Sequence, residues 1–168
     1  MGERVIRYGF LALLAAMVLL FSVAAPGFVS ARSAVFVLQS VAITGILALG
    51  VTATLVVGGF DLSIGAVATS SMMLSAYIMV VWGMGAVPAL LACLVMGAVI
   101  GFVNGVIITR ARVPDLLATL GMMFLLMGLQ RIPTAGRSIA TGMTLPDGSV
   151  AEGKFSPSFL ALGRHRID

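Results

Sequence analysis

The chain has 168 residues, of which 60% are hydrophobic and 10% are charged, and its formal net charge is +4. Soluble domains average nearer half apolar and a quarter charged, so this composition indicates an integral membrane protein and excludes a soluble enzyme, a disordered tail and a disulfide scaffold. One cysteine cannot form an internal disulfide, and one histidine cannot build a metal cluster. The ten basic residues lie between apolar runs rather than on one clustered face, so we expect no nucleic-acid partner.

Long uncharged runs account for most of the sequence. These runs are Tyr8–Ala31, Ser33–Phe60, Leu62–Thr109 and Leu116–Gln130. One bilayer span takes about 20 apolar residues, so the third run is long enough for two spans, with a turn at Gly83 to Pro88. We therefore predict an all-α integral membrane protein with about five transmembrane helices, at about residues 8–25, 34–57, 62–82, 87–108 and 115–131.

Basic residues beside the spans predict the orientation. Arg4 and Arg7 precede the first span, and Arg110 and Arg112 follow the fourth. Cytoplasmic loops carry an excess of Lys and Arg, so both pairs are expected in the cytoplasm. Alternating spans then leave Arg32 outside, against the rule.

Two domains follow from this span pattern. Residues 1–131 form a transmembrane helical domain, and residues 132–168 form an extracytoplasmic loop or tail rich in turn-forming residues. Five basic residues between positions 131 and 166 oppose this orientation, but long loops determine topology weakly. Val23-Ala24-Ala25 is similar to a signal-peptide cleavage site; the long apolar core before it and the four later spans favour an uncleaved first helix.

The segment between the second and third spans holds the most informative residues. Gly58 and Gly59 favour a break in the helix, and Asp61 or Ser63 can cap the helix that follows. Gly65 completes the sequence GGFDLSIG. Two interpretations remain open: a cytoplasmic turn with a capping carboxylate, or a break inside the membrane that lines a cavity, the setting in which irregular backbone at that depth is tolerated.

Hydroxyl side chains gather on one face of the third span. They are Ser63, Ser70, Ser71, Ser75 and Tyr77. At 100° per residue these positions fall within an arc of roughly 160°. Such a face can bind a polyhydroxylated solute along a translocation path, or it can form hydrogen bonds between packed helices.

The fourth span carries a small residue at every fourth position. This small-residue ridge comprises Ala89, Cys93, Gly97, Gly101 and Gly105. Small side chains let helix backbones approach closely, so the ridge predicts helix packing, chiefly through its three glycines. Asn104 lies beside the ridge, where its amide can bond a neighbouring helix or a solute.

The sequence carries no convincing catalytic or nucleotide-binding motif. Gly148 to Lys154 has the spacing of a phosphate-binding loop, but Phe155 follows where Ser or Thr would hold magnesium. No apolar strand precedes this segment. We therefore expect no catalytic residues, no bound cofactor and no metal site.

Three ordered motifs resemble one family. Residues 58–65 resemble the G-G-I-D-L-S-V-G signature of the ribose-type permeases of bacterial ABC importers. Residues 97–110, GAVIGFVNGVIITR, resemble the G-x-x-x-G-x-x-N-G-x-x-I-T stretch of that family, and residues 113–121, VPDLLATLG, resemble its I-P-P-F-I-A-T-L-G. The resemblance covers residues 5–140. Asp115 departs from a common proline, and Met127 departs from a common arginine.

The resemblance implies a multi-pass permease subunit in the bacterial inner membrane that imports a sugar or sugar-like solute. It implies a second permease chain, identical or different, together with cytoplasmic ATP-binding subunits that hydrolyse ATP and a periplasmic solute-binding protein. Such permeases are about twice as long, so we interpret the chain as an N-terminal half that inserts into the bilayer without driving ATP-dependent uptake. The alternatives are a secondary transporter or channel subunit, and a nonfunctional truncated fragment.

Overall fold

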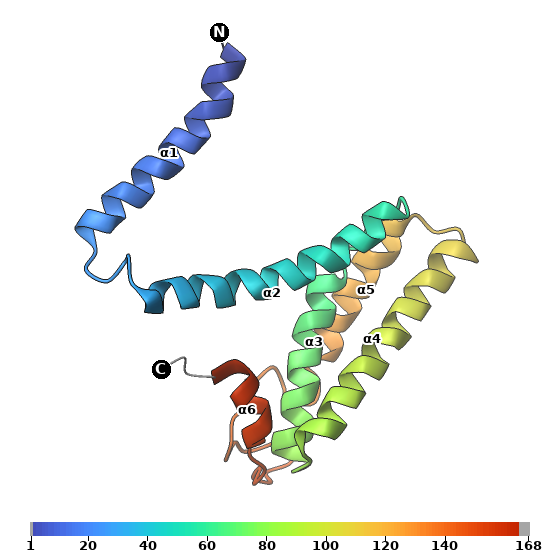
Figure 1. The fold of residues 1–168 in the computed structure, drawn as a ribbon. Helices are drawn as coiled ribbons and strands as arrows, with labels where there is room; N and C mark the ends of the chain where they lie inside the picture. Colours follow the sequence, from blue (N-terminus) through green and yellow to red (C-terminus); the bar gives the residue numbers. More distant parts are fainter. Residues whose placement is uncertain (1, 165–168) are drawn as a thin grey trace. The chain divides into compact units, whose positions relative to one another are not determined.

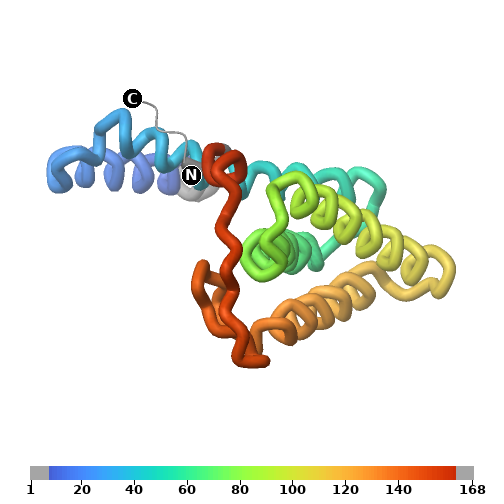
Figure 2. Tube along the Cα trace, turned by 90° about the horizontal axis from the view of Figure 1, so that it is seen from below, coloured from blue at the N-terminus to red at the C-terminus, as the bar shows by residue number. Residues whose placement is uncertain are grey.

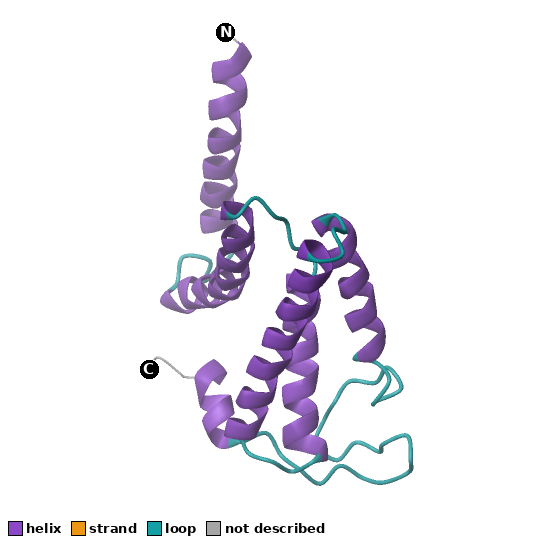
Figure 3. Cartoon of the chain, turned by 90° about the vertical axis from the view of Figure 1, so that its right-hand side faces the viewer, coloured by secondary structure: helices purple, strands orange, loops and turns teal. Residues whose placement is uncertain are grey.

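A computed structural model describes the backbone of residues 2–164 and the side chains of residues 8–161. Every regular element in this part of the chain is helical (Figures 1 and 3). The elements are α1 (Gly2–Ala24), α2 (Ala31–Val56), α3 (Ile64–Ala76), the π-helical turn η1 (Tyr77–Val81), α4 (Ala86–Thr109), α5 (Asp115–Leu129) and α6 (Pro157–Arg164). The predicted all-α fold with five apolar helices is confirmed. The short α6 was not predicted.

Three helical segments are long and apolar enough to cross a membrane. They are α2, the continuous α3–η1 segment Ile64–Val81, and α4. Two shorter apolar helical segments, Tyr8–Ala24 and Asp115–Leu129, complete the predicted set. α1 begins at Gly2 rather than near Tyr8, because the arginines before Tyr8 are good helix formers and do not end a helix.

The chain divides into two compact units, with the boundary between Ala48 and Leu49 inside α2. In the first unit, apolar side chains such as Leu20 and Ile46 are about two-thirds exposed. α2 contains no buried residue along its whole length. Helices that are apolar all round need an apolar environment, which a bilayer or neighbouring helices provide.

The second unit contains the packed core. α3 contacts both α4 and α5, and α4 also contacts α5. One buried cluster joins Ala66 of α3, Ile100 of α4, and Met122 and Leu126 of α5. A second cluster, which includes Met79 and Ala89, closes the η1 end. These contacts hold α3 between α4 and α5, and η1 against α4 (Figure 2).

The segment between α5 and α6 folds back onto the η1 end of this unit (Figure 2). It forms a tight turn in which Thr144 and Val150 make an isolated antiparallel bridge. At the tip, the hydroxyl and N–H of Ser149 bond Asp147 and hold the pKa of that carboxyl below its usual range. This turn lies where the sequence has phosphate-loop spacing, and it lacks the strand-loop-helix context of a nucleotide site.

Gly153 attaches this segment to η1. Its N–H donates to the Val80 carbonyl oxygen at 3.0 Å. A Cβ at position 153 would overlap the carbonyl oxygens of Met79 and Val80 and lie 2.8 Å from the Val80 carbonyl carbon. Glycine is therefore required at position 153 by the close approach of two backbones.

Candidate functional site

The predicted helix break occurs at the glycine pair. α2 ends at Val56, and Gly58 adopts a positive φ of 81°. The Gly58 N–H donates to the Leu55 carbonyl and the Gly59 N–H donates to the Thr54 carbonyl, both at 3.0 Å. This is the Schellman arrangement, in which a left-handed glycine ends a helix and satisfies its last carbonyls. The two glycines therefore form the C-terminal stop of α2.

Side chains from α5 hold the irregular segment that follows. The Phe60 N–H donates to Asp115 Oδ2 at 2.6 Å, and the Leu62 N–H donates to Thr119 Oγ1 at 3.1 Å. Thr119 is only 1% exposed. These bonds give partners to backbone groups that have none in a helix.

Asp61, Ser63 and Asn104 form a chain of hydrogen bonds from the break to α4. Asp61 Oδ1 accepts the Ser63 N–H at 2.7 Å and the Ser63 hydroxyl at 2.6 Å. Asn104 Nδ2 donates to Ser63 Oγ at 3.1 Å. Ser63 and Asn104 are both buried, and Asn104 Oδ1 has no hydrogen-bond partner among the described residues.

These bonds correct the predicted capping role of Ser63. Ser63 occupies the N-cap position of α3, but its side chain makes no capping bond, because the hydroxyl is directed to Asp61. Asp61 supplies the turn-forming carboxylate instead, in the manner of an Asx turn. Gly65, in the first turn of α3, is exposed and has open space around it.

We call this group the polar junction: the break at residues 58–63 together with Asn104, Asp115 and Thr119. It lies at the end of the bundle where α4 ends at Thr109 and α5 begins. Sequence reasoning found the break and Asn104 but treated Asp115 only as a departure from proline and did not use Thr119. The sequence did contain a signal for Asp115. It is an acid at the predicted start of a helix, where free N–H groups favour a carboxylate.

Several hydroxyls of the third span are engaged within the protein. The Ser70 hydroxyl donates to Gln130 Oε1 at 3.3 Å, and the Ser75 hydroxyl donates to the Met72 carbonyl at 2.9 Å. The Ser71 carbonyl accepts a bond from the Cys93 thiol. The Tyr77 ring packs edge-on against Trp82. The Ser70 bond links α3 to the end of α5. It is the kind of interhelical hydrogen bond that was one of the two interpretations of this hydroxyl face.

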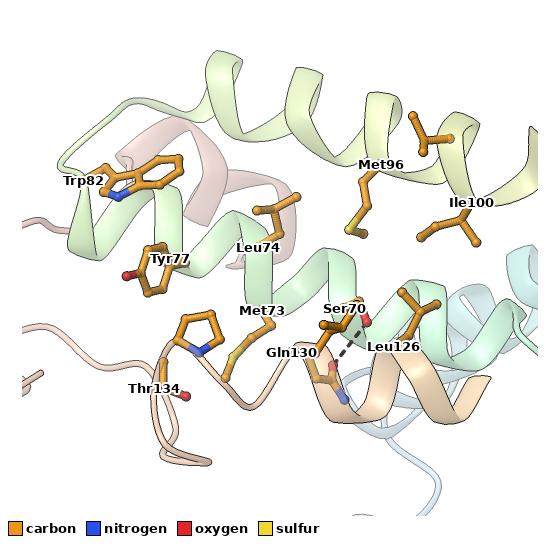
Figure 4. Close-up of a pocket in the computed structure, with 13 residues that line it drawn as sticks. Ser70, Met73, Leu74, Tyr77, Trp82, Met96, Ile100, Leu126, Gln130 and Thr134 are labelled. Carbon is orange, nitrogen blue, oxygen red and sulfur yellow. Dashed lines mark hydrogen bonds between the residues drawn. The ribbon is translucent and has the colours of Figure 1, made fainter. Parts of the chain in front are cut away.

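An apolar hollow of about 490 Å³ lies between α3, α4 and α5 (Figure 4). Its walls include Leu74, Met96, Ile100 and Leu126, with Tyr77 and Trp82 near the η1 end. Thr134 also lines it, and the Thr134 hydroxyl is fully buried without a partner among the described residues. The hollow thus presents almost entirely hydrocarbon, which does not suit the polyhydroxylated solute inferred for this face.

The small-residue ridge of α4 is only partly covered within this chain. Ala89 is buried and Cys93 is half-buried. A Cβ at Gly97, Gly101 or Gly105 would meet no other atom within 4 Å. Within the second unit no helix therefore packs closely on the three glycines, and their packing role stays a prediction.

No group of three or more metal-ligating side chains occurs in the part of the chain that the structure describes. The polar junction has hydrogen-bonding atoms and two carboxylates, Asp61 beside Ser63 and Asp115 beside Phe60. Its arrangement fixes the path of the backbone between α2 and α3.

Comparison with known proteins identifies the family. Residues 33–162 match the family model described as "Branched-chain amino acid transport system / permease component". The chain is 34% identical over 128 residues to a ribose import permease protein of Escherichia coli K12, covering 76% of this chain and 40% of that protein. It is 30% identical over 112 residues to a fructose import permease protein of Rhizobium meliloti, covering 67% of this chain and 31% of that protein.

A third relative is an inner membrane ABC transporter permease protein of Escherichia coli K12, 35% identical over 104 residues, covering 62% of this chain and 31% of that protein. The chain thus spans less than half the length of the curated relatives it matches. No solved structure matches the chain. These similarities confirm the resemblance to ribose-type permeases.

Proposed function

Since the chain belongs to the family of branched-chain amino acid transport system permease components, we propose that it is a membrane-spanning permease subunit of an ATP-driven importer for a sugar or sugar-like solute. The observation that carries this proposal is the family match over residues 33–162, which includes the polar junction. Relatives named for ribose and fructose import favour a small hydroxylated solute over an amino acid.

We propose that this subunit acts in the bacterial inner membrane, because one relative is named as an inner membrane ABC transporter permease protein. It pairs with a second permease chain, receives solute from a periplasmic binding protein, and couples to cytoplasmic ATP-binding subunits. Its own role is to provide a path through the bilayer, and ATP hydrolysis occurs on the separate subunits.

The proposed orientation places the polar junction and Arg110 in the cytoplasm and residues 132–164 outside. The bond between Phe60 and Asp115 lies at the same end of the bundle as Arg110, where α4 ends. The bond between Gly153 and Val80 lies at the other end of α3–η1. The two ends of α3–η1 therefore contact different segments of the chain. This is expected of a helix that crosses the membrane, with one end in the cytoplasm and the other outside.

We propose that Gly58, Gly59, Asp61, Ser63 and Asn104 hold the start of α3 in place beside the translocation path. Their hydrogen bonds join α2, α3 and α4 at one point. A secondary transporter is the competing function. It is less well supported because ion coupling normally uses ionisable groups within spans, and Asp61 is the one acid between residues 8 and 110.

Uptake in the native bacterium tests the function. Deleting the gene that contains this sequence should abolish uptake of one labelled sugar from a panel of pentoses and hexoses, and restoring the complete gene should restore that uptake. Uptake should survive a protonophore but fail when cellular ATP is depleted. Unchanged uptake of every sugar would contradict the proposal, and loss of uptake with the protonophore alone would favour the secondary transporter.

A further inference from the structure

A second hollow, of about 350 Å³, lies between α3 and the segment that follows α5. We call it the basic cleft. Its polar lining comprises Thr69, Gln130, Arg131, Arg137 and Ser138. Met73 and Gln130 also line the apolar hollow, so the two spaces adjoin. The volume falls within the range of about 300–1,000 Å³ that is typical of ligand pockets.

The basic cleft lies beside the interior of a candidate membrane span. The bond between Ser70 and Gln130 places the end of α5 level with Ser70. With a rise of about 1.5 Å per residue, Ser70 is about 9 Å from Ile64 and about 16 Å from Val81. Arg131 follows Gln130 directly, so its backbone lies beside the middle of α3–η1.

The two arginines have few partners within the protein. Among residues 8–161 no carboxylate lies within ion-pair distance of either guanidinium, and Arg137 makes a single long bond, from Nη1 to the Thr144 carbonyl at 3.4 Å. Each guanidinium carries five N–H donors. Both arginines are exposed, so the cleft presents many donors that the described residues do not use.

Gln130 adds a further donor. Its Oε1 accepts a hydrogen bond from the Ser70 hydroxyl, so its amide nitrogen is directed away from Ser70 (Figure 4). The Thr69 hydroxyl is already bonded to the Gly65 and Ala66 carbonyls of its own helix. The cleft thus supplies an excess of donors over acceptors, which matches a ligand that presents several acceptor oxygens.

From this geometry we infer that the basic cleft binds the transported solute, with Arg131, Arg137 and the Gln130 amide donating hydrogen bonds to its hydroxyl and ring oxygens. The inference rests on the proposed function, because it assigns that function a solute-binding position. It names a small polyhydroxylated solute as the ligand. The hydroxyl face of α3 contributes little to this site, because Ser70 and Ser75 already bond the protein.

Uptake by single-site variants at the native locus provides the first test. Arg131→Gln and Arg137→Gln should each raise the KM for sugar uptake about tenfold or more, the fold-change for loss of a hydrogen bond to a charged group. Arg32→Gln is the matched control, because Arg32 is also an exposed arginine but lies outside the cleft. Its KM should equal that of the unmodified strain. Immunoblotting of membranes separates altered transport from reduced abundance.

Cysteine protection provides a second test that needs no transport. Ser138→Cys in a Cys93→Ser background places one thiol in the cleft, and the sugar taken up by the unmodified strain should slow its reaction with a maleimide. The mirror-image sugar at the same concentration should not slow it. If the arginine variants fail to accumulate, this measurement alone decides the inference.

The outcomes distinguish the inference from the function on which it rests. Unchanged KM in both arginine variants, or labelling unaffected by the sugar, overturns the cleft assignment while the importer function stands. The thiol of Ser138→Cys could instead be protected by assembly with a partner chain and not by sugar. That result assigns the cleft to contact with an acidic surface of the partner, and it also overturns the inference. No sugar uptake dependent on the unmodified gene overturns the proposed function itself.

Discussion

Thr119 offers a direct measure of how much the polar junction stabilises the fold. Its hydroxyl accepts the Leu62 N–H at 3.1 Å and donates to the Asp115 carbonyl at 2.8 Å. Thr119→Val replaces this hydroxyl with a methyl group of similar size. The Leu62 N–H then loses its partner, and Leu62 lies in an irregular segment that has no helical bond to replace it.

The expected cost follows from the lost partner. A donor left without a partner away from water costs about 1–3 kcal/mol. The lost bond is half-buried and joins Leu62, which is 37% exposed, to Thr119, which is 1% exposed. Thr69→Val is the matched control, because the exposed Thr69 bonds only the Gly65 and Ala66 carbonyls of its own helix. Both changes occur within helices and carry the same propensity difference, so that contribution cancels. The control should change stability by no more than about 0.5 kcal/mol.

Thermal unfolding in detergent micelles measures the difference. Cys93 is the single cysteine and is half-buried, so a thiol-reactive fluorophore reports its exposure as the chain unfolds. For a chain of this size 1 kcal/mol corresponds to about 2–4 °C in Tm, so Thr119→Val should melt roughly 2–12 °C below Thr69→Val. Equal melting temperatures would refute the reasoning, because they would show that water satisfies the Leu62 N–H.

Three further predictions concern topology, the break and the tail. A cysteine at position 150, in a background lacking the native one, should be labelled from outside; labelling from the cytoplasmic side alone would reverse the orientation. Asp61→Ala should reduce membrane abundance and uptake more than Asp147→Ala, since Asp61 holds Ser63 at the junction whereas Asp147 lies in an exposed turn; wild-type behaviour of both variants would make Asp61 an ordinary surface residue. Gly153→Ala should lower stability by about 1–3 kcal/mol, because its Cβ would overlap the backbone of η1. Gly101→Ala has open space around it and should raise stability by up to about 1 kcal/mol, because alanine favours the helix. A Gly153→Ala variant more stable than Gly101→Ala would refute the close approach at η1.

Local sequence patterns determined the elements of this fold. Apolar run length predicted the five apolar helices, because a helix that satisfies its own backbone can form wherever side chains are uniformly apolar. The glycine pair predicted the end of α2, because a left-handed residue favours glycine on steric grounds alone. The motifs around residues 58–65 and 97–110 indicated the family, and this needed no knowledge of packing.

Tertiary structure decided the partners of the polar groups. Nothing in the sequence pairs Phe60 with Asp115 or Leu62 with Thr119, because these bonds join positions more than 50 residues apart and depend on how α3 and α5 pack. Ser63 is of a residue type and at a position that favour helix capping. In the folded chain its hydroxyl instead donates to Asp61 and accepts a bond from Asn104.

The tail and the ridge show the same division. Gly153 has no local signal as a packing residue, and only the approach of η1 makes a side chain impossible there. The glycines of α4 form a clear ridge in the sequence, yet the helices of the second unit leave them open. A periodic pattern fixes which face of a helix can pack closely, whereas the neighbour on that face depends on distant parts of the assembly.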